Sequence, residues 1–174
     1  RSDYRSENVE EMMDKNLLVH VEQGIEITMR FFDGETIYAD MTNPDTRYYV
    51  WEKLKKNYIK NGIHLFWLDE AEPGYTKYDY GNYRHYLGSA LQVGNIYPQM
   101  YTRMFYEGLK GEGYSEIVNL VRCAWAGSQR YGALVWSGDI PSTWESLRRQ
   151  ICAGMNIGMA GIPWWTTDIG GFSG

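Results

Sequence analysis

Apolar residues along the chain follow two spacings, one typical of amphipathic helices and one of buried strands. Val50, Leu54 and Tyr58 recur at helical spacing. Residues 63–68 instead form an uninterrupted apolar run, which favours a strand buried on both faces, as in a parallel sheet covered by helices. The same patterns predict helices over 6–15, 43–61, 98–109 and 141–153, and buried strands over 63–68, 117–124, 133–136 and 161–166. Helices and strands that alternate in this order predict parallel pairing and the α/β class.

Capping residues mark the ends of two of these helices. Asn43 is a favourable N-cap, and Pro44 suits the first helical position. Ser142 and Glu145, three residues apart, have the pattern of a capping box at the start of the last helix. Gly154 is the first stop signal in that helix, which is therefore expected to end just before it.

Near the N-terminus the pattern changes to short alternating segments. Residues 17–21 and 25–32 are predicted to be two strands joined by a turn, with a further strand over 36–39. Together they predict a small β insertion over residues 16–40. Residues 74–95 are rich in Tyr, Gly and Asn and are expected to form a long loop with one short turn of helix.

Composition and charge limit the class of partner. The net charge of −5 argues against a nucleic-acid surface, and no apolar run approaches the roughly 18 residues that span a bilayer. The three His residues lack metal-ligand spacing, and no dinucleotide or P-loop glycine motif is present, so neither a metal nor a cofactor is expected. Cys123 and Cys152 are expected to be small buried side chains.

The length of 174 residues suits one domain but is below the roughly 250 residues of a complete eight-stranded α/β barrel. Neither end has the features of a natural terminus, so we expect the sequence to be part of a longer chain. Its compartment, cytoplasmic or exported, and its oligomeric state are left open.

Charged residues lie at the carboxyl ends of the four predicted strands. These residues are Asp69, Arg122, Asp139 and Asp168, and each of the three carboxylates follows a strand that contains Trp. In parallel α/β folds, ligands bind at this end of the sheet. Aromatic rings that stack on sugars, together with two carboxyl groups, are what hydrolysis of a glycosidic bond requires. The residues alone leave open another α/β enzyme, and any single carboxylate has the alternative role of a helix N-cap.

Four segments carry a family resemblance. Residues 67–72 (WLDEAE) resemble the W-x-D-x-x-E nucleophile motif of glycoside hydrolase family 31, and residues 122–131 (RCAWAGSQRY) resemble its R-[SC]-x-x-x-G-[SA]-Q segment. Residues 136–139 (WSGD) are similar to its W-x-G-D acid/base motif, and residues 168–172 (DIGGF) match its D-I-G-G-F motif. The motifs occur in the family's order, and the resemblance covers nearly the whole chain.

The resemblance implies a (β/α)8 TIM barrel, of which residues 1–174 form roughly the middle half of one catalytic domain, about strands 4 to 7. It implies that Asp69 is the nucleophile and Asp139 the general acid/base. Trp67 is implied to pack beneath the nucleophile, and Glu72 to orient its surroundings. The full set of implied substrate-binding residues is Trp67, Glu72, Arg122, Trp136 and Asp168.

The function that the resemblance implies is a retaining α-glycoside hydrolase that releases a terminal α-linked sugar, here an α-xylosidase. Alternatives within the family are an α-glucosidase, another α-glycosidase, a transglycosylase or a lyase. An alternative of another class is a non-catalytic carbohydrate-binding module. The expected partner is an oligosaccharide or other α-glycoside, and the 174 residues alone are expected to show little or no activity.

Overall fold

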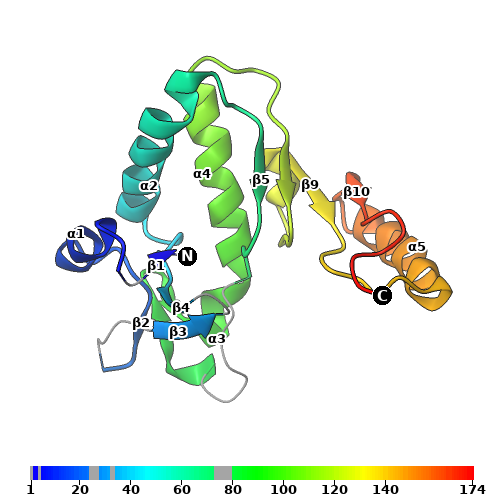
Figure 1. Ribbon diagram of the computed structural model, residues 1–174, viewed down its shortest axis with the longest axis horizontal. Coiled ribbons are helices and arrows are strands. Elements are labelled where there is room, and N and C mark those ends of the chain that lie inside the picture. The colour runs from blue at the N-terminus through cyan, green and yellow to red at the C-terminus, as the bar shows by residue number, and fades with distance from the viewer. Residues whose placement is uncertain (1, 4, 24–27, 32–33, 73–79) are drawn as a thin grey trace.

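A parallel sheet of four strands forms the centre of the computed structural model (Figure 1). The structure describes residues 2–3, 5–23, 28–31, 34–72 and 80–174. The four strands are β5 (Phe66–Leu68), β8 (Asn119–Val121), β9 (Ala133–Trp136) and β10 (Trp165–Thr166), and they pair in that order. Parallel neighbours that follow the chain order are the arrangement of a barrel, whereas a doubly wound sheet reverses its order midway. The predicted α/β class and parallel pairing are therefore confirmed.

Helices flank this sheet at both ends. The α-helices are α1 (Asn8–Asp14), α2 (Pro44–Asn57), α3 (Ala90–Val93), α4 (Tyr97–Gly111) and α5 (Trp144–Met159). The 3-10 helices are η1 (Ile59–Asn61), η2 (Tyr80–Asn82), η3 (Gly94–Ile96) and η4 (Ser128–Tyr131). Helices α2 and α4 stand side by side next to β5, and α5 lies beside β10 (Figure 1). In the part of the chain that the structure describes, no helix has the length and apolar character needed to cross a bilayer.

The start of α2 agrees with its sequence signals. The Asn43 side chain accepts a hydrogen bond from the backbone N–H of Asp45 at 2.9 Å, and Pro44 occupies the first turn. The segment ends after η1 at Gly62, whose φ of 81° is in the left-handed region that favours glycine.

Helix α5 differs from its prediction at both ends. The capping box of Ser142 and Glu145 is wrong, because Thr143 is still extended and its own hydroxyl accepts the N–H of Ser146 at 3.1 Å. Gly154 lies inside the helix instead of ending it. Its lack of a side chain leaves room for a neighbouring ring, since an added Cβ would lie 2.6 Å from Cδ1 of Trp165 in β10.

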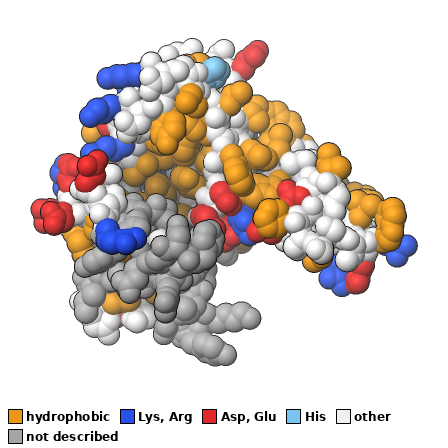
Figure 2. Space-filling model, in the orientation of Figure 1, with side chains coloured by type: hydrophobic (Ala, Val, Ile, Leu, Met, Phe, Trp, Pro, Cys, Tyr) orange, Lys and Arg blue, Asp and Glu red, His pale blue; other side chains and the backbone are white. Residues whose placement is uncertain are grey.

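The two faces of the parallel sheet have different surroundings. Leu68, Val121 and Val135 are buried in the apolar core shared with α2 and α4. Trp67, on the opposite face of β5, is 63% exposed, and Leu65 is also exposed. Within residues 1–174, β5 is therefore buried on one face only, which differs from the prediction of burial on both. Figure 2 shows apolar side chains gathered across the middle of one face, with charged side chains beside them.

Two small antiparallel sheets lie below α2 and α4 in Figure 1. One pairs β1 (Ser2–Asp3), β4 (Gly34–Ile37) and β3 (Thr28–Phe31), and the other pairs β2 (His20–Val21), β6 (Tyr83–His85) and β7 (Gly88–Ser89). The two strands predicted over 17–21 and 25–32 lie in different sheets, because β2 pairs with β6 and β3 pairs with β4. The predicted loop over 74–95 contains β6, β7 and α3, while residues 24–27, 32–33 and 73–79 lie outside the described part. That 16–40 forms an insertion stays a prediction.

A buried carboxylate joins the β2–β6–β7 sheet to the segment before α2. Asp40 accepts hydrogen bonds from the Thr42 hydroxyl at 2.7 Å and from the Tyr86 N–H at 2.5 Å, and its Oδ1 lies 3.2 Å from His85 Nδ1. Burial alone acts to raise the pKa of Asp40, but His85, Tyr86 and Thr42 outweigh it, so the pKa is lowered. The segment before α2 is thereby fixed to β6.

Candidate active site

The predicted site residues follow the parallel strands at their carboxyl ends. Asp69 comes directly after β5, Arg122 directly after β8, Asp139 shortly after β9 and Asp168 shortly after β10. Side chains alternate between the two faces of a strand, so Asp69 shares the open face with Trp67. The parallel register brings these strand ends to one edge of the sheet.

Arg122 connects three carboxylates at this edge. Its Nη1 atom lies 3.4 Å from Asp69 Oδ1 and 3.4 Å from Asp139 Oδ1, and its Nε atom lies 2.7 Å from Glu72 Oε1. Partial burial acts to lower the pKa of Arg122, but Glu72, Asp139 and Asp69 outweigh it and raise the pKa. The structure therefore brings three of the predicted carboxylates together around the permanent positive charge of Arg122.

The spacing of the two carboxylates follows from this arrangement. Asp69 Oδ1 and Asp139 Oδ1 are both 3.4 Å from the same nitrogen, so they are separated by at most twice that distance. This range includes the separation of about 5–5.5 Å found in retaining glycosidases, and it excludes most of the roughly 6.5–9.5 Å found in inverting ones.

The backbone beside Asp69 adopts an unusual conformation. Glu70 has a φ of 53°, in the left-handed region, which costs a non-glycine residue about 1–2 kcal/mol. The Glu70 N–H donates a hydrogen bond to Asp69 Oδ1 at 2.9 Å. The carboxylate thus accepts one backbone hydrogen bond and lies beside one guanidinium.

The turn after β9 positions Asp139. Gly138 has a φ of 70°, a conformation in which glycine is unstrained. The Ser137 hydroxyl lies 3.0 Å from the Thr167 hydroxyl and so links this turn to the loop after β10. The acid/base candidate is therefore held by contacts between two neighbouring strand ends.

Two tryptophans form an aromatic wall beside the carboxylates. The rings of Trp67 and Trp136 meet edge to face with centroids 5.7 Å apart. Trp136 is 5% exposed and lies under the Arg122 guanidinium at 5.9 Å, whereas Trp67 presents an open ring face. A hollow of about 320 Å³ is lined by Trp67, Leu120, Trp136, Thr166, Thr167 and Asp168.

The segment after Arg122 is folded back by internal contacts. The Ser128 hydroxyl accepts the N–H of Trp125 at 3.0 Å, and the Gln99 side chain of α4 donates to the Ala126 carbonyl at 2.8 Å. Gly127 lies against Gln99, where an added Cβ would be 2.4 Å from Nε2. The Gly-Ser-Gln part of this motif therefore shapes the loop, while Arg122 carries the charge.

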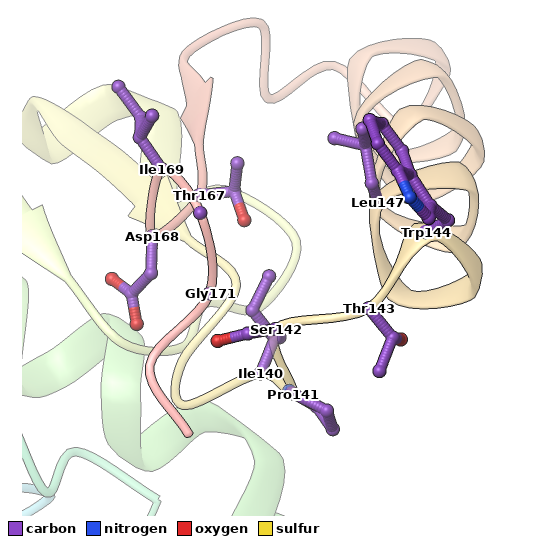
Figure 3. A pocket seen from close by; sticks show the side chains of 11 residues that line it. Ile140, Pro141, Ser142, Thr143, Trp144, Leu147, Thr167, Asp168, Ile169 and Gly171 are labelled. Carbon is purple, nitrogen blue, oxygen red and sulfur yellow. The ribbon is translucent and has the colours of Figure 1, made fainter. Parts of the chain in front are cut away.

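A second, larger hollow adjoins the site. It has a volume of about 580 Å³ and lies between the first turns of α5 and the loop after β10; Figure 3 shows Trp144 and Leu147 across from Ile169. The Ser142 N–H donates to the Ser173 carbonyl at 2.7 Å and keeps these segments together. Gly171 leaves no room for a side chain, since an added Cβ would lie 2.5 Å from the Cα of Ser142.

One contact was missed by sequence reasoning. Cys123, predicted to be a small buried side chain, directs its thiol toward Glu72 Oε2 at 3.8 Å. Burial, followed by the charge of Glu72, raises the pKa of this thiol to about 12. Cys152 is exposed, so its predicted burial is wrong. The only sequence signal for the contact between Cys123 and Glu72 was that Cys123 directly follows Arg122.

These observations define the class of protein: an α/β-barrel sheet whose carboxyl edge holds two carboxylates around an arginine, beside a wall of tryptophan. Over residues 1–174 the chain matches the model of the glycosyl hydrolases family 31 TIM-barrel domain. The chain belongs to this family, and the predicted family and barrel fold are confirmed.

Relatives of known name agree with this assignment. The chain is 55% identical over 170 residues to "Uncharacterized family 31 glucosidase ORF2" of Pseudescherichia vulneris. The alignment covers 98% of this chain and 32% of that protein. It is 35% identical over 155 residues to alpha-xylosidase A of Aspergillus niger, and the alignment covers 76% of this chain and 21% of that protein. The crystal structure of a family 31 α-xylosidase from a soil metagenome complexed with xylose matches with a TM-score of 0.94 at 61% identity. The match covers 99% of this chain and 25% of that one. The chain spans about a third or less of the length of these relatives.

Proposed function

We propose that the full-length protein is a retaining α-glycoside hydrolase, and that its substrate is an α-xyloside. The observation that carries this proposal is the arrangement of Asp69 and Asp139, each 3.4 Å from the same nitrogen of Arg122. Two carboxyl groups at this spacing are suited to a double displacement.

In the first step, an oxygen of Asp69 attacks the anomeric carbon while Asp139 donates a proton to the leaving oxygen. The Asp69–carbon bond forms, the glycosidic bond breaks, and the leaving alcohol carries the proton away. Positive charge develops on the sugar ring in the transition state, and the negative charge of Asp69 stabilises it.

In the second step, Asp139, now ionised, takes a proton from water, and the water oxygen attacks the anomeric carbon. The ester to Asp69 breaks and the sugar leaves with its α configuration retained. Trp67 stacks on the sugar through its exposed ring face, and Asp168, on the border of the same hollow, accepts hydrogen bonds from sugar hydroxyls.

The choice of sugar rests on relatedness. The structure with 61% identity is an α-xylosidase complexed with xylose, while the relative with 55% identity is named a glucosidase, so α-glucosides are the second candidate. A carbohydrate-binding module needs aromatic rings but not a pair of carboxylates around Arg122, which favours the enzyme.

The proposal is tested with the full-length enzyme on p-nitrophenyl α-xyloside and p-nitrophenyl α-glucoside. We expect higher kcat/KM on the xyloside, and proton NMR should show α-xylose as the first product. Absence of turnover on both substrates, or β-xylose as the first product, would contradict the proposal.

The roles of Asp69 and Asp139 can be distinguished with substrates whose leaving groups differ in their need for a proton. Asp69→Asn should abolish turnover of every α-glycoside, while the exposed Asp14→Asn serves as the control of equal charge change. Asp139→Ala should slow an unactivated α-xyloside far more than the p-nitrophenyl glycoside, because p-nitrophenolate leaves without protonation. Equal losses on both substrates would rule out Asp139 as the acid.

A further inference from the structure

Both carboxylate oxygens of Glu72 contact other side chains of the protein. Its Oε1 lies 2.7 Å from Arg122 Nε, and its Oε2 lies 3.8 Å from Cys123 Sγ. The carboxylate from the loop after β5 therefore contacts two consecutive residues that follow β8. This is the shortest ion pair that the structure records at the site, so Glu72 is the group to which Arg122 is most tightly fixed.

The contacts of Arg122 with the other two carboxylates are long. A relaxed arginine–carboxylate pair has nitrogen–oxygen distances of about 2.7–2.9 Å, whereas Arg122 Nη1 lies 3.4 Å from both Asp69 and Asp139. A guanidinium free to move would close on one of them. A close pair with Asp69 would occupy the attacking oxygen, and a close pair with Asp139 would favour its ionised form and oppose proton donation.

We propose that Glu72 is a positioning residue for the reaction: it anchors the Arg122 guanidinium through Nε, so that Nη1 stays between the two carboxylates without closing on either. This inference rests on the proposed function. It makes Arg122, and not the bound sugar, the group that Glu72 contacts.

Cys123 completes the anchor. Because its thiol stays protonated at neutral pH, the S–H is available to donate to Glu72 Oε2 while Arg122 holds Oε1. In the described part of the chain, the titratable groups recorded against Arg122 are Asp69, Glu72, Asp139 and Cys123. Tyr101 of α4 lies behind them, its pKa raised to about 12 by burial and then by Asp69.

The test is Glu72→Gln in the full-length enzyme, which keeps the size of the side chain and removes its charge. We expect kcat/KM to fall roughly 10- to 100-fold, mainly through kcat, because a misplacement of about 1 Å in a catalytic group has an effect of this size. A guanidinium closer to Asp139 favours the ionised form of the acid and should move the alkaline limb of the pH–rate profile to lower pH by roughly one unit. A guanidinium closer to Asp69 favours the ionised nucleophile and should move the acid limb to lower pH by a similar amount. Cys123→Ala should cause a smaller loss, about two- to fivefold.

Glu116→Gln, at an exposed position outside the site, is the matched control and should leave the rate and the pH profile unchanged. A Glu72→Gln enzyme that loses rate without a shift in its pH profile would indicate a merely structural role and overturn the inference. The crystal structure of the variant gives a readout independent of activity: Arg122 should move toward Asp69 or Asp139, and an unmoved guanidinium would overturn the inference. Wild-type enzyme without glycosidase activity would instead overturn the proposed function.

Discussion

Gly108 of α4 packs directly against Trp51 of α2, and an alanine at this position should lower stability. An added Cβ at Gly108 would lie 2.2 Å from Cδ2 and 2.3 Å from Cε2 of Trp51. Optimal carbon–carbon contact is about 3.5–4.0 Å, so the ring would have to move by more than 1 Å. Trp51 is buried and meets Phe105 edge to face at 6.4 Å, so the space for such a movement is limited.

The magnitude follows from two opposing effects. Ala is better than Gly inside a helix by about 1 kcal/mol, while overpacking a close-packed core costs about 3 kcal/mol at its upper range. Gly108→Ala should therefore destabilise the domain by about 2 kcal/mol. Gly111→Ala, three residues along α4, meets nothing within 4 Å and should be neutral or stabilising by up to about 1 kcal/mol.

Thermal unfolding of the full-length protein, followed by tryptophan fluorescence, measures both variants. For a domain of about 250 residues, Gly108→Ala should lower Tm by about 4–8 °C. The reasoning is refuted if Gly108→Ala melts at or above the wild-type temperature. A large loss in Gly111→Ala would show that the substitution acts through the helix itself and not through Trp51.

Three further predictions concern the backbone, a buried charge and a helix cap. Glu70→Val should lower both stability in urea unfolding and kcat, and should cost more than Glu70→Gly, because a β-branched residue is strained in the left-handed conformation next to Asp69. Asp40→Asn should cost about 3 kcal/mol of unfolding free energy at pH 7. Because the folded-state pKa of Asp40 is lowered, the wild type loses this stability as pH falls below about 3.8. Urea unfolding across that range should therefore show a flatter acid limb for the variant, and an unchanged limb would contradict the assignment. Thr143→Ala should cost about 1 kcal/mol in thermal unfolding through loss of the cap on Ser146, and Ser142→Ala, the residue first expected to cap, should cost less.

Much of the fold was predictable where local chemistry decides it. Asn43 and Pro44 define the start of α2 because they act on neighbouring backbone groups. Strand β9 was predicted over its full range because it is a short apolar run bounded by turn residues. The positions of Asp69 and Asp139 after predicted strands indicated that they would lie close together, since parallel strands present their carboxyl ends at one edge.

Other features depend on partners that are distant in sequence. Nothing in a two-residue strand such as β2 indicates that it pairs with β6. Gly154 has the signature of a helix stop, and the close approach of Trp165, which is distant in sequence, is what accounts for a glycine inside the helix. The left-handed conformation of Glu70 has no sequence signal, because the surrounding structure imposes it.

The short connection between β8 and β9 has a consequence for the order of folding. These strands are joined by η4 without an α-helix, so Asn119 and Ala133 pair across a small loop. Closing a small loop costs less chain entropy than closing the long segment between β5 and β8, which includes α4. Arg122 and Asp139 therefore come together early, as parts of one local unit, and Asp69 joins them only when the longer segment closes. Mutations between residues 119 and 136 should slow folding more than equally destabilising mutations in β5.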